Sequence, residues 1–159
     1  MTLKVAMQMD PVQGINIDAD SSFVIALEAQ ARGHELFYYH PDQMMYEDGR
    51  VLARTQRLEL RRERGNHYTL GDAKLTDLST LDVVWLRQDP PFDMAYLTTT
   101  YLLDMIHPRT LVVNNPTEVR RNPEKLYIAR FPDLVPPTLI TRDIAAIKAF
   151  RAKHTDIIV

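Results

Sequence analysis

The order of elements at the start of the chain constrains its fold more than any other feature. A short apolar run at residues 3–9 ends in Asp10-Pro11, and residues 21–31 then carry apolar side chains at helical intervals. Gly33 lies where a helix commonly ends, and residues 35–39 are again rich in strand-forming side chains. A strand, a helix and a strand in this order favour two parallel strands with a right-handed crossover. The sequence therefore predicts an α/β fold with an open, mainly parallel sheet flanked by helices.

The middle of the chain departs from this alternation. Glu47-Asp48-Gly49 is a tight-turn signal between two apolar segments, and residues 50–64 then alternate loosely with many charges. We therefore expect a β-rich excursion at the sheet edge over residues 44–72. The α/β order resumes with a strand at 83–86, a helix at 94–106 and a strand at 111–113. The helix carries Leu97, Tyr101, Leu102 and Met105 on one side.

After Asn122-Pro123 the pattern starts again. It predicts a short helix at 123–127, a brief strand at 138–140 and a helix from Asp143 to about His154. The apolar side of the last helix carries Ile144, Ile147 and Phe150. Residues 156–159 resemble the start of another strand, and a buried strand rarely ends a natural domain. We therefore expect a chain cut off within a longer protein, one domain followed by the start of a second.

Composition excludes several classes of function. The formal net charge is −2 with both signs intermixed, so the chain lacks the basic stripe of a nucleic-acid or membrane-surface binder. The one basic cluster, residues 54–64, is interrupted by acidic and apolar residues and is better explained as a solvated strand face. Absence of cysteine excludes disulfides, thiolate catalysis and cysteine-type zinc sites. No apolar run is long enough for a membrane span and no secretory signal is present, so we expect a cytoplasmic protein.

Ligands of an open parallel sheet bind outside the carboxyl ends of its strands, where three loops qualify: residues 10–20, 87–93 and 114–118. The first loop leads into a helix N-terminus, whose free N–H groups favour an anion such as a substrate carboxylate. Asn16, Ser21 and Ser22 would add side-chain donors. From the residues alone, capping of the helix by Asp20 and Ser21 is the simpler interpretation.

The second loop, residues 87–93, is the densest cluster of polar groups. Arg87 can hold a carboxylate with two parallel hydrogen bonds, and Asp89 can accept hydrogen bonds from an ammonium group. Two consecutive prolines, Pro90 and Pro91, stiffen the loop and reduce the entropy lost on binding. An Arg87–Asp89 ion pair that merely fixes the loop is an equally good interpretation. The chain has no glycine-rich phosphate loop, no histidines at metal-ligand spacing and no distinctive acid–base pair.

Several short motifs follow one another in a fixed order along the chain. They are Met9-Asp10-Pro11, Asn16-Ile17, Asp20-Ser21-Ser22-Phe23, Leu27-Glu28-Ala29-Gln30, Arg32-Gly33, Arg87-Gln88-Asp89-Pro90-Pro91-Phe92-Asp93, Val113-Asn114-Asn115-Pro116, Glu124-Lys125-Leu126 and Pro136-Pro137-Thr138-Leu139-Ile140-Thr141-Arg142. In kind and in order these motifs resemble those of bacterial glutathione synthetases. The resemblance extends over the whole chain, so it is far more specific than any single motif. It departs from the family at two positions, where a lysine is usual: Gln88 and Asn115.

The resemblance implies a pre-ATP-grasp, Rossmann-like substrate domain over residues 1–120 and the start of an ATP-grasp domain over 121–159. Such enzymes use ATP with Mg²⁺, or Mn²⁺ in its place, to join glycine to γ-glutamylcysteine through an acyl phosphate. By resemblance, the loops that contain Asn16, Ser21 and Ser22, and Arg87 and Asp89, face γ-glutamylcysteine.

Lys125 matches a position that contacts ATP, although from the residues alone it is an ordinary solvated helix lysine. No catalytic residue and no metal ligand falls within the chain, which is expected to be inactive alone and to bind neither ATP nor Mg²⁺ tightly. Family members assemble into dimers or tetramers. Two alternatives stay open: another ATP-grasp carboxylate–amine ligase, and a non-catalytic binding or assembly module.

Overall fold

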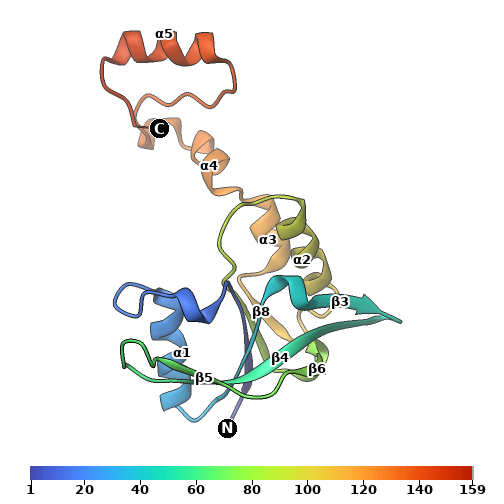
Figure 1. Cartoon of the computed structure of the whole chain (residues 1–159). Helices are drawn as coiled ribbons and strands as arrows, with labels where there is room; N and C mark the ends of the chain where they lie inside the picture. Colours follow the sequence, from blue (N-terminus) through green and yellow to red (C-terminus); the bar gives the residue numbers. More distant parts are fainter. Residues whose placement is uncertain (159) are drawn as a thin grey trace. The chain divides into compact units, whose positions relative to one another are not determined.

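The computed structural model describes residues 1–158, except for the side chain of Glu124. The chain divides into two compact units, Met1–Arg121 and Asn122–Val159. Figure 1 shows the course of the chain through its helices and strands. None of the helices within residues 1–158 is both long and apolar enough to cross a membrane.

Four parallel strands form the centre of the first unit. They are β1 (Lys4–Gln8), β2 (Glu35–Tyr39), β7 (Val83–Leu86) and β8 (Leu111–Val113), in the spatial order β2-β1-β7-β8. β1 lies between two neighbours, and four of its five residues are buried, as a strand covered on both faces requires. The expectation of an α/β fold with parallel strands is confirmed.

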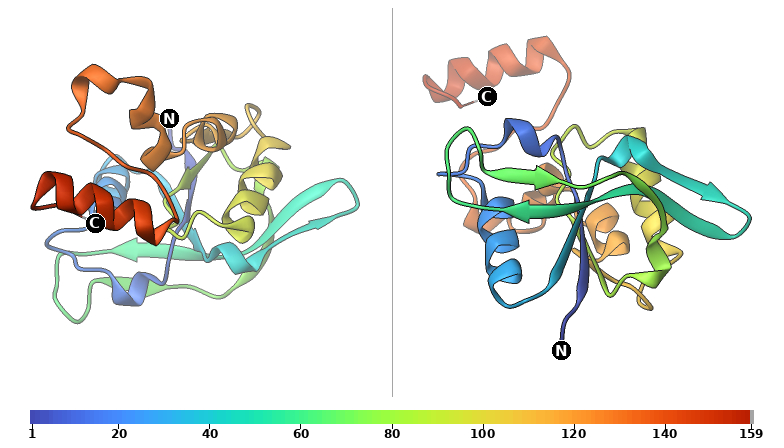
Figure 2. Two further views of the ribbon diagram at one scale, coloured as in Figure 1. Left: turned by 90° about the horizontal axis from the view of Figure 1, so that it is seen from above. Right: turned by 60° about the horizontal axis from the view of Figure 1, so that its bottom comes forward.

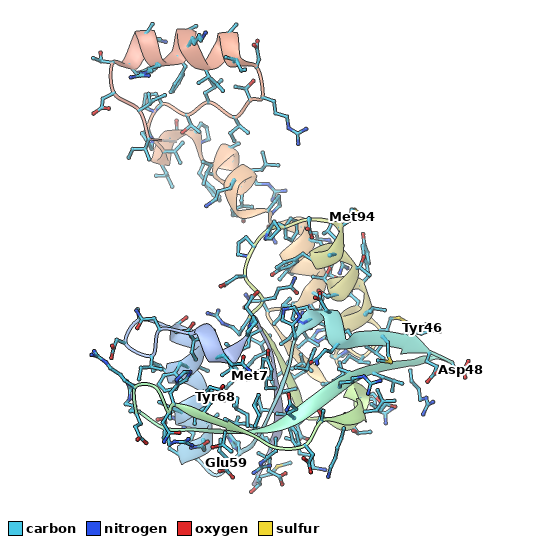
Figure 3. The ribbon with its side chains drawn as sticks, in the orientation of Figure 1. Met7, Tyr46, Asp48, Glu59, Tyr68 and Met94 are labelled. Carbon is cyan, nitrogen blue, oxygen red and sulfur yellow. The ribbon has the colours of Figure 1, made fainter. Side chains whose placement is uncertain are left out.

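The β-rich excursion is confirmed and extends beyond residue 72, to Asp77. β3 (Met44–Glu47) and β4 (Arg50–Leu60) form an antiparallel hairpin whose turn residues, Asp48 and Gly49, both have positive φ. β5 (Tyr68–Leu70) and β6 (Lys74–Asp77) pair with opposite ends of β4, and β4 also pairs with β2. The sheet is therefore mixed and curls along the long strand β4 (Figure 2). Figure 3 shows Tyr46 and Asp48 at the far end of the hairpin.

Helices cover both faces of this sheet. α1 (Ser21–Ala31) buries Phe23 and Ala26 against Met7 and Tyr38 on one face. α2 (Met94–Asp104) and α3 (Pro116–Arg121) cover the other face, where Leu103 packs in one cluster with Val84 and Leu86. Short 3-10 turns connect the elements at Val12–Gly14, Pro41–Gln43, Leu78–Thr80, Ile128–Arg130 and Pro132–Leu134.

The apolar side of α2 is buried only in part. Leu102 packs against the core cluster, whereas Tyr101 and Met105 are 58% and 57% exposed. Thr100 and Leu103 are fully buried instead. The hydroxyl of Thr100 donates to the carbonyl of Leu97 at 2.7 Å, so this polar side chain enters the core without an unsatisfied donor. A pattern of apolar residues alone does not predict the burial of Thr100.

Both ends of α1 follow from local sequence. The carboxylate of Asp20 accepts the backbone N–H of Phe23 at 2.8 Å, which makes Asp20 the N-cap. At the other end, Gly33 has φ +80°, and the N–H groups of Gly33 and His34 donate to the carbonyls of Gln30 and Ala29. This is the glycine-terminated helix end that satisfies the last carbonyls.

Replacing Asp20 by alanine is expected to lower the free energy of unfolding by about 1 kcal/mol, because the first turn of α1 loses its side-chain acceptor. Asp18→Ala is the matched control, since Asp18 is exposed and pairs only with exposed Arg64. Its loss should cost less than about 0.5 kcal/mol. Urea denaturation of the two variants checks this, and equal losses would contradict the capping role.

The second unit contains two helices, α4 (Glu124–Tyr127) and α5 (Ile144–His154), and both expected helices are confirmed. The expected strand at 138–140 is wrong, because these residues are irregular. Residues 156–158 are not a strand either, and Val159 lies outside the described residues. An extended segment becomes a strand only when a partner pairs with its backbone, and residues 122–158 contain no other strand to do so.

The apolar side of α5 is uncovered within this unit. Ile144 is 67% exposed and Leu134 in the preceding turn is 81% exposed. No residue that the structure describes between 122 and 158 is fully buried. The described residues from 122 to 158 therefore form no hydrophobic core of their own.

Candidate functional site

The candidate site lies at the carboxyl ends of β1, β7 and β8, on the face of the sheet that α1 covers. Met7, Trp85 and Val113 are register neighbours on these three strands and form one apolar row. Figure 3 shows Met7 inside the unit. A hollow of about 150 Å³ opens there, lined by Met7, Ser22, Ile25, Trp85, Leu86, Arg87, Val113 and Asn114.

Arg87 is the charged group of this hollow. Its Nε donates to the Ser22 hydroxyl at 2.8 Å, and its Nη2 donates to the Ser21 hydroxyl at 2.7 Å. Asp20 caps α1, so both serine hydroxyls remain available to hold the guanidinium. The start of α1 can therefore be capped while Ser21 and Ser22 take part in a binding site. The sequence expectation that Ser21, Ser22 and Arg87 belong to one site is consistent with this geometry.

Asp89 is held by its backbone rather than by Arg87. Its N–H donates to the carboxylate of Asp10 at 2.7 Å, and within residues 1–158 Arg87 forms no ion pair with Asp89. The interpretation of an Arg87–Asp89 ion pair is therefore wrong. Asp10, which the sequence analysis did not single out, ties the loop after β1 to the loop after β7. Its position directly after a buried strand was the signal that could have identified it.

Tyr96, near the start of α2, also lies at this loop. Burial raises the pKa of Tyr96, while the charge of Arg87 lowers it and that of Asp89 raises it again. The hydroxyl of Tyr96 therefore stays protonated near neutral pH, close enough to Arg87 and Asp89 for both charges to act on it.

The two remaining predicted site residues are Asn16 and Lys125. The Asn16 side-chain oxygen accepts the N–H of Asp18 at 3.1 Å, and Asn16 shares no hydrogen bond with Arg87 or Asp89 among the described residues. Lys125 lies on α4 in the second unit, with an exposed side chain. Its expected contact with ATP stays a prediction.

The described residues do not offer a metal site. Within residues 1–158, no three histidine, aspartate or glutamate side chains come close enough together to hold a metal ion. A bound Mg²⁺ ion needs carboxylate oxygens or phosphate oxygens as ligands.

Comparison with known proteins identifies the family. Residues 3–120 match the model of the prokaryotic glutathione synthetase N-terminal domain, and residues 124–159 match the ATP-grasp domain of the same enzymes. The chain belongs to the prokaryotic glutathione synthetase family.

Curated relatives in this family carry the name glutathione synthetase. The relative from Mesorhizobium japonicum is 54% identical over 159 residues, which is 100% of this chain and 51% of that protein. The relative from Rhodopseudomonas palustris is 56% identical over 154 residues, 97% of this chain and 49% of the relative. The relative from Vibrio cholerae is 42% identical over 157 residues, 98% of this chain and 49% of the relative. The chain thus spans about half the length of the glutathione synthetases that it matches.

Gln88 and Asn115, where the sequence analysis expects departures from the family pattern, both form side-chain hydrogen bonds within the first unit. Asn115 caps α3, because its side-chain oxygen accepts the N–H of Glu118 at 3.2 Å. Its amide also lies 3.3 Å from Nε2 of His107. Gln88 turns away from the hollow and bonds to Gln8 inside the sheet at 3.0 Å. Asn115 thus stabilises the start of α3, and Gln88 joins the loop after β7 to β1.

Proposed function

We propose that this chain forms the substrate-binding half of a glutathione synthetase, an ATP-dependent ligase that joins glycine to γ-glutamylcysteine. The observation that carries the proposal is the match of the chain, from residue 3 to residue 159, to both domain models of this family. Residues 1–120 would be the substrate domain, and residues 121–159 the start of the ATP-grasp domain. The break between the two compact units, after Arg121, supports this division.

The arrangement around Arg87 suits the glutamyl end of γ-glutamylcysteine. This end carries a free carboxylate and an ammonium group. Arg87 would bind the carboxylate through the guanidinium N–H groups that Ser21 and Ser22 leave free. Asp89, exposed two residues later, would accept hydrogen bonds from the ammonium group. The adjacent hollow of about 150 Å³ would receive apolar parts of the substrate.

This arrangement leaves the other carboxylate of the substrate, on the cysteinyl residue, free to react. In the proposed reaction that carboxylate takes up the γ-phosphoryl group of ATP to form an acyl phosphate, and ADP leaves. The amine of glycine then attacks the acyl carbon and expels phosphate. Groups that stabilise the transferring phosphoryl group, Mg²⁺ among them, would lie in the remainder of the ATP-grasp domain. The role of Lys125 toward ATP, assembly into dimers or tetramers and a cytoplasmic location stay predictions.

Release of ADP tests the proposal. The full-length protein should release ADP from ATP and Mg²⁺ only when glycine and γ-glutamylcysteine are both present, and the 159-residue chain alone should release none. Activity of the full-length protein without γ-glutamylcysteine would favour another ATP-grasp carboxylate–amine ligase. Turnover by the 159-residue chain alone would overturn the assignment of the reacting groups to the rest of the enzyme. A full-length protein inert with all substrates would favour the binding or assembly module.

A further inference from the structure

A fully buried glutamine lies in the central strand of the sheet. Gln8, the last residue of β1, has no exposed surface and faces the apolar layer under α2. Its register neighbours are Tyr39 on β2 and Leu86 on β7. Burial of an amide is unfavourable unless all its polar atoms are hydrogen-bonded. A polar side chain at this position therefore needs an explanation beyond packing.

The amide of Gln8 has a partner for each of its polar atoms. Its oxygen accepts the hydroxyl of buried Tyr39 at 2.9 Å. Its Nε2 donates to the side-chain oxygen of Gln88 at 3.0 Å and lies 3.4 Å from the hydroxyl of Thr99. Thr99 in turn donates to the carbonyl of Tyr96 at 2.8 Å. These four side chains, Gln8, Tyr39, Gln88 and Thr99, are called the Gln8 network.

The hydrogen bonds of the Gln8 network run in one direction. The hydroxyl of Tyr39, which stays protonated because burial raises its pKa, donates to the oxygen of Gln8. With its oxygen on Tyr39, the Gln8 amide directs Nε2 at Gln88. Gln88 can meet this donor only with its own oxygen. Position 88 therefore requires a side chain with a hydrogen-bond acceptor. An ammonium group at position 88 could not accept a hydrogen bond from the amide N–H of Gln8.

The Gln8 network also reaches the candidate site. Gln88 lies between Arg87 and Asp89, and all three positions are hydrogen-bonded to Gln8 of β1 or to Asp10, which follows it. The N–H of Arg87 donates to the carbonyl of Gln8 at 2.8 Å, and the N–H of Asp89 donates to Asp10. With the side chain of Gln88 directed inward on the α2 face, the side chain of Arg87 is directed to Ser21 and Ser22 on the α1 face.

We propose that Gln8 is a positioning residue for substrate binding: through Gln88 it holds the Arg87–Asp89 loop so that the guanidinium faces the hollow. Gln8 touches no substrate itself. The inference rests on the proposed function, because it assigns the loop to γ-glutamylcysteine. Loss of the Gln8 amide should loosen the loop and weaken binding of γ-glutamylcysteine, while the binding of ATP and glycine is retained.

The test compares Gln8→Met with Thr110→Val in the full-length protein. Methionine retains the length of the side chain but cannot form the two side-chain hydrogen bonds. Thr110 is the matched control, since it is also fully buried and its hydroxyl lies within hydrogen-bond distance of Leu78 O and Leu81 O, away from the loop. We expect Gln8→Met to raise KM for γ-glutamylcysteine about tenfold, the effect of losing one or two hydrogen bonds. The KM values for ATP and glycine, and all three in Thr110→Val, should change less than about twofold.

Two further measurements cover the remaining outcomes. Gln88→Ala breaks the network from its more accessible end and should give the same selective rise in KM if Gln8→Met does not fold. Hydrogen exchange of the Arg87 and Asp89 amides should be faster in Gln8→Met and unchanged in Thr110→Val, whether or not the enzyme makes glutathione.

A KM for γ-glutamylcysteine within about twofold of the wild type in both network variants would overturn the proposal. So would equal rises for all substrates, or unchanged exchange of the two amides. A wild-type protein that makes no glutathione would instead refute the proposed function and leave the exchange result to decide the positioning role.

Discussion

Replacing Arg87 by alanine in the full-length protein is expected to raise KM for γ-glutamylcysteine about 100-fold. Loss of two charge-assisted hydrogen bonds to a carboxylate costs about 3 kcal/mol, which corresponds to this factor. Arg87→Lys should recover only part of the loss, because one ammonium group cannot bind Ser21, Ser22 and a carboxylate in the geometry of a guanidinium. The KM values for ATP and glycine should stay near those of the wild type.

Arg32→Ala is the control for Arg87→Ala. Arg32 belongs to the other end of α1, is 69% exposed and pairs with Glu28 on the surface. Its removal should change no KM by more than about twofold. Steady-state kinetics with each substrate varied in turn measures these values. If Arg87→Ala lowers the melting temperature but leaves KM for γ-glutamylcysteine unchanged, Arg87 only ties the loop to α1, and the substrate assignment fails.

Replacing Phe23 by alanine is expected to lower the free energy of unfolding by about 3–5 kcal/mol. Phe23 is 1% exposed and joins α1 to the core on its face of the sheet. Its ring packs edge-on against buried His67, with the ring centroids 6.1 Å apart, and the guanidinium of Arg62 lies over it at 5.9 Å. Removal of the ring leaves a cavity between α1 and the β4–β5 side of the sheet.

The neighbouring residue provides the control for Phe23→Ala. Val24 is 45% exposed on the outer side of the same helix, and alanine is a better helix former than valine. Val24→Ala should therefore change the free energy of unfolding by less than about 0.5 kcal/mol. Urea denaturation followed by circular dichroism compares the two. Similar losses would show that α1 is not anchored through Phe23.

Much of the fold could be predicted because it depends on local patterns. The cap at Asp20, the helix end at Gly33 and the turn at Asp48-Gly49 each require particular residue types at particular positions, and the structure contains all three. The burial of Thr100 on α2 was not predicted, because only the folded helix shows that its hydroxyl is satisfied by the carbonyl of Leu97. The expected strand at 138–140 was wrong because a strand depends on a partner that local sequence does not reveal.

The candidate site could be predicted only in part. Ser21, Ser22 and Arg87 were identified because residues at strand ends and helix starts meet at one edge of a parallel sheet. Asp10 was missed although it directly follows a buried strand, and Tyr96 was missed because nothing local distinguishes it from other helical tyrosines. Whether Asn16 and Lys125 contact substrates stays a prediction.

By itself the sequence determined the strand–helix–strand frame and the family, because apolar periodicity, caps and ordered motifs are local properties. Only the tertiary structure decided which polar groups meet. Gln8 bonds to Gln88, 80 positions away, and Ser22 bonds to Arg87, 65 positions away. These contacts depend on strand order and register, which bring distant residues within about 3 Å of one another, the distance at which hydrogen bonds form. No local pattern specifies that alignment, so the pairing of these groups became visible only in the folded chain.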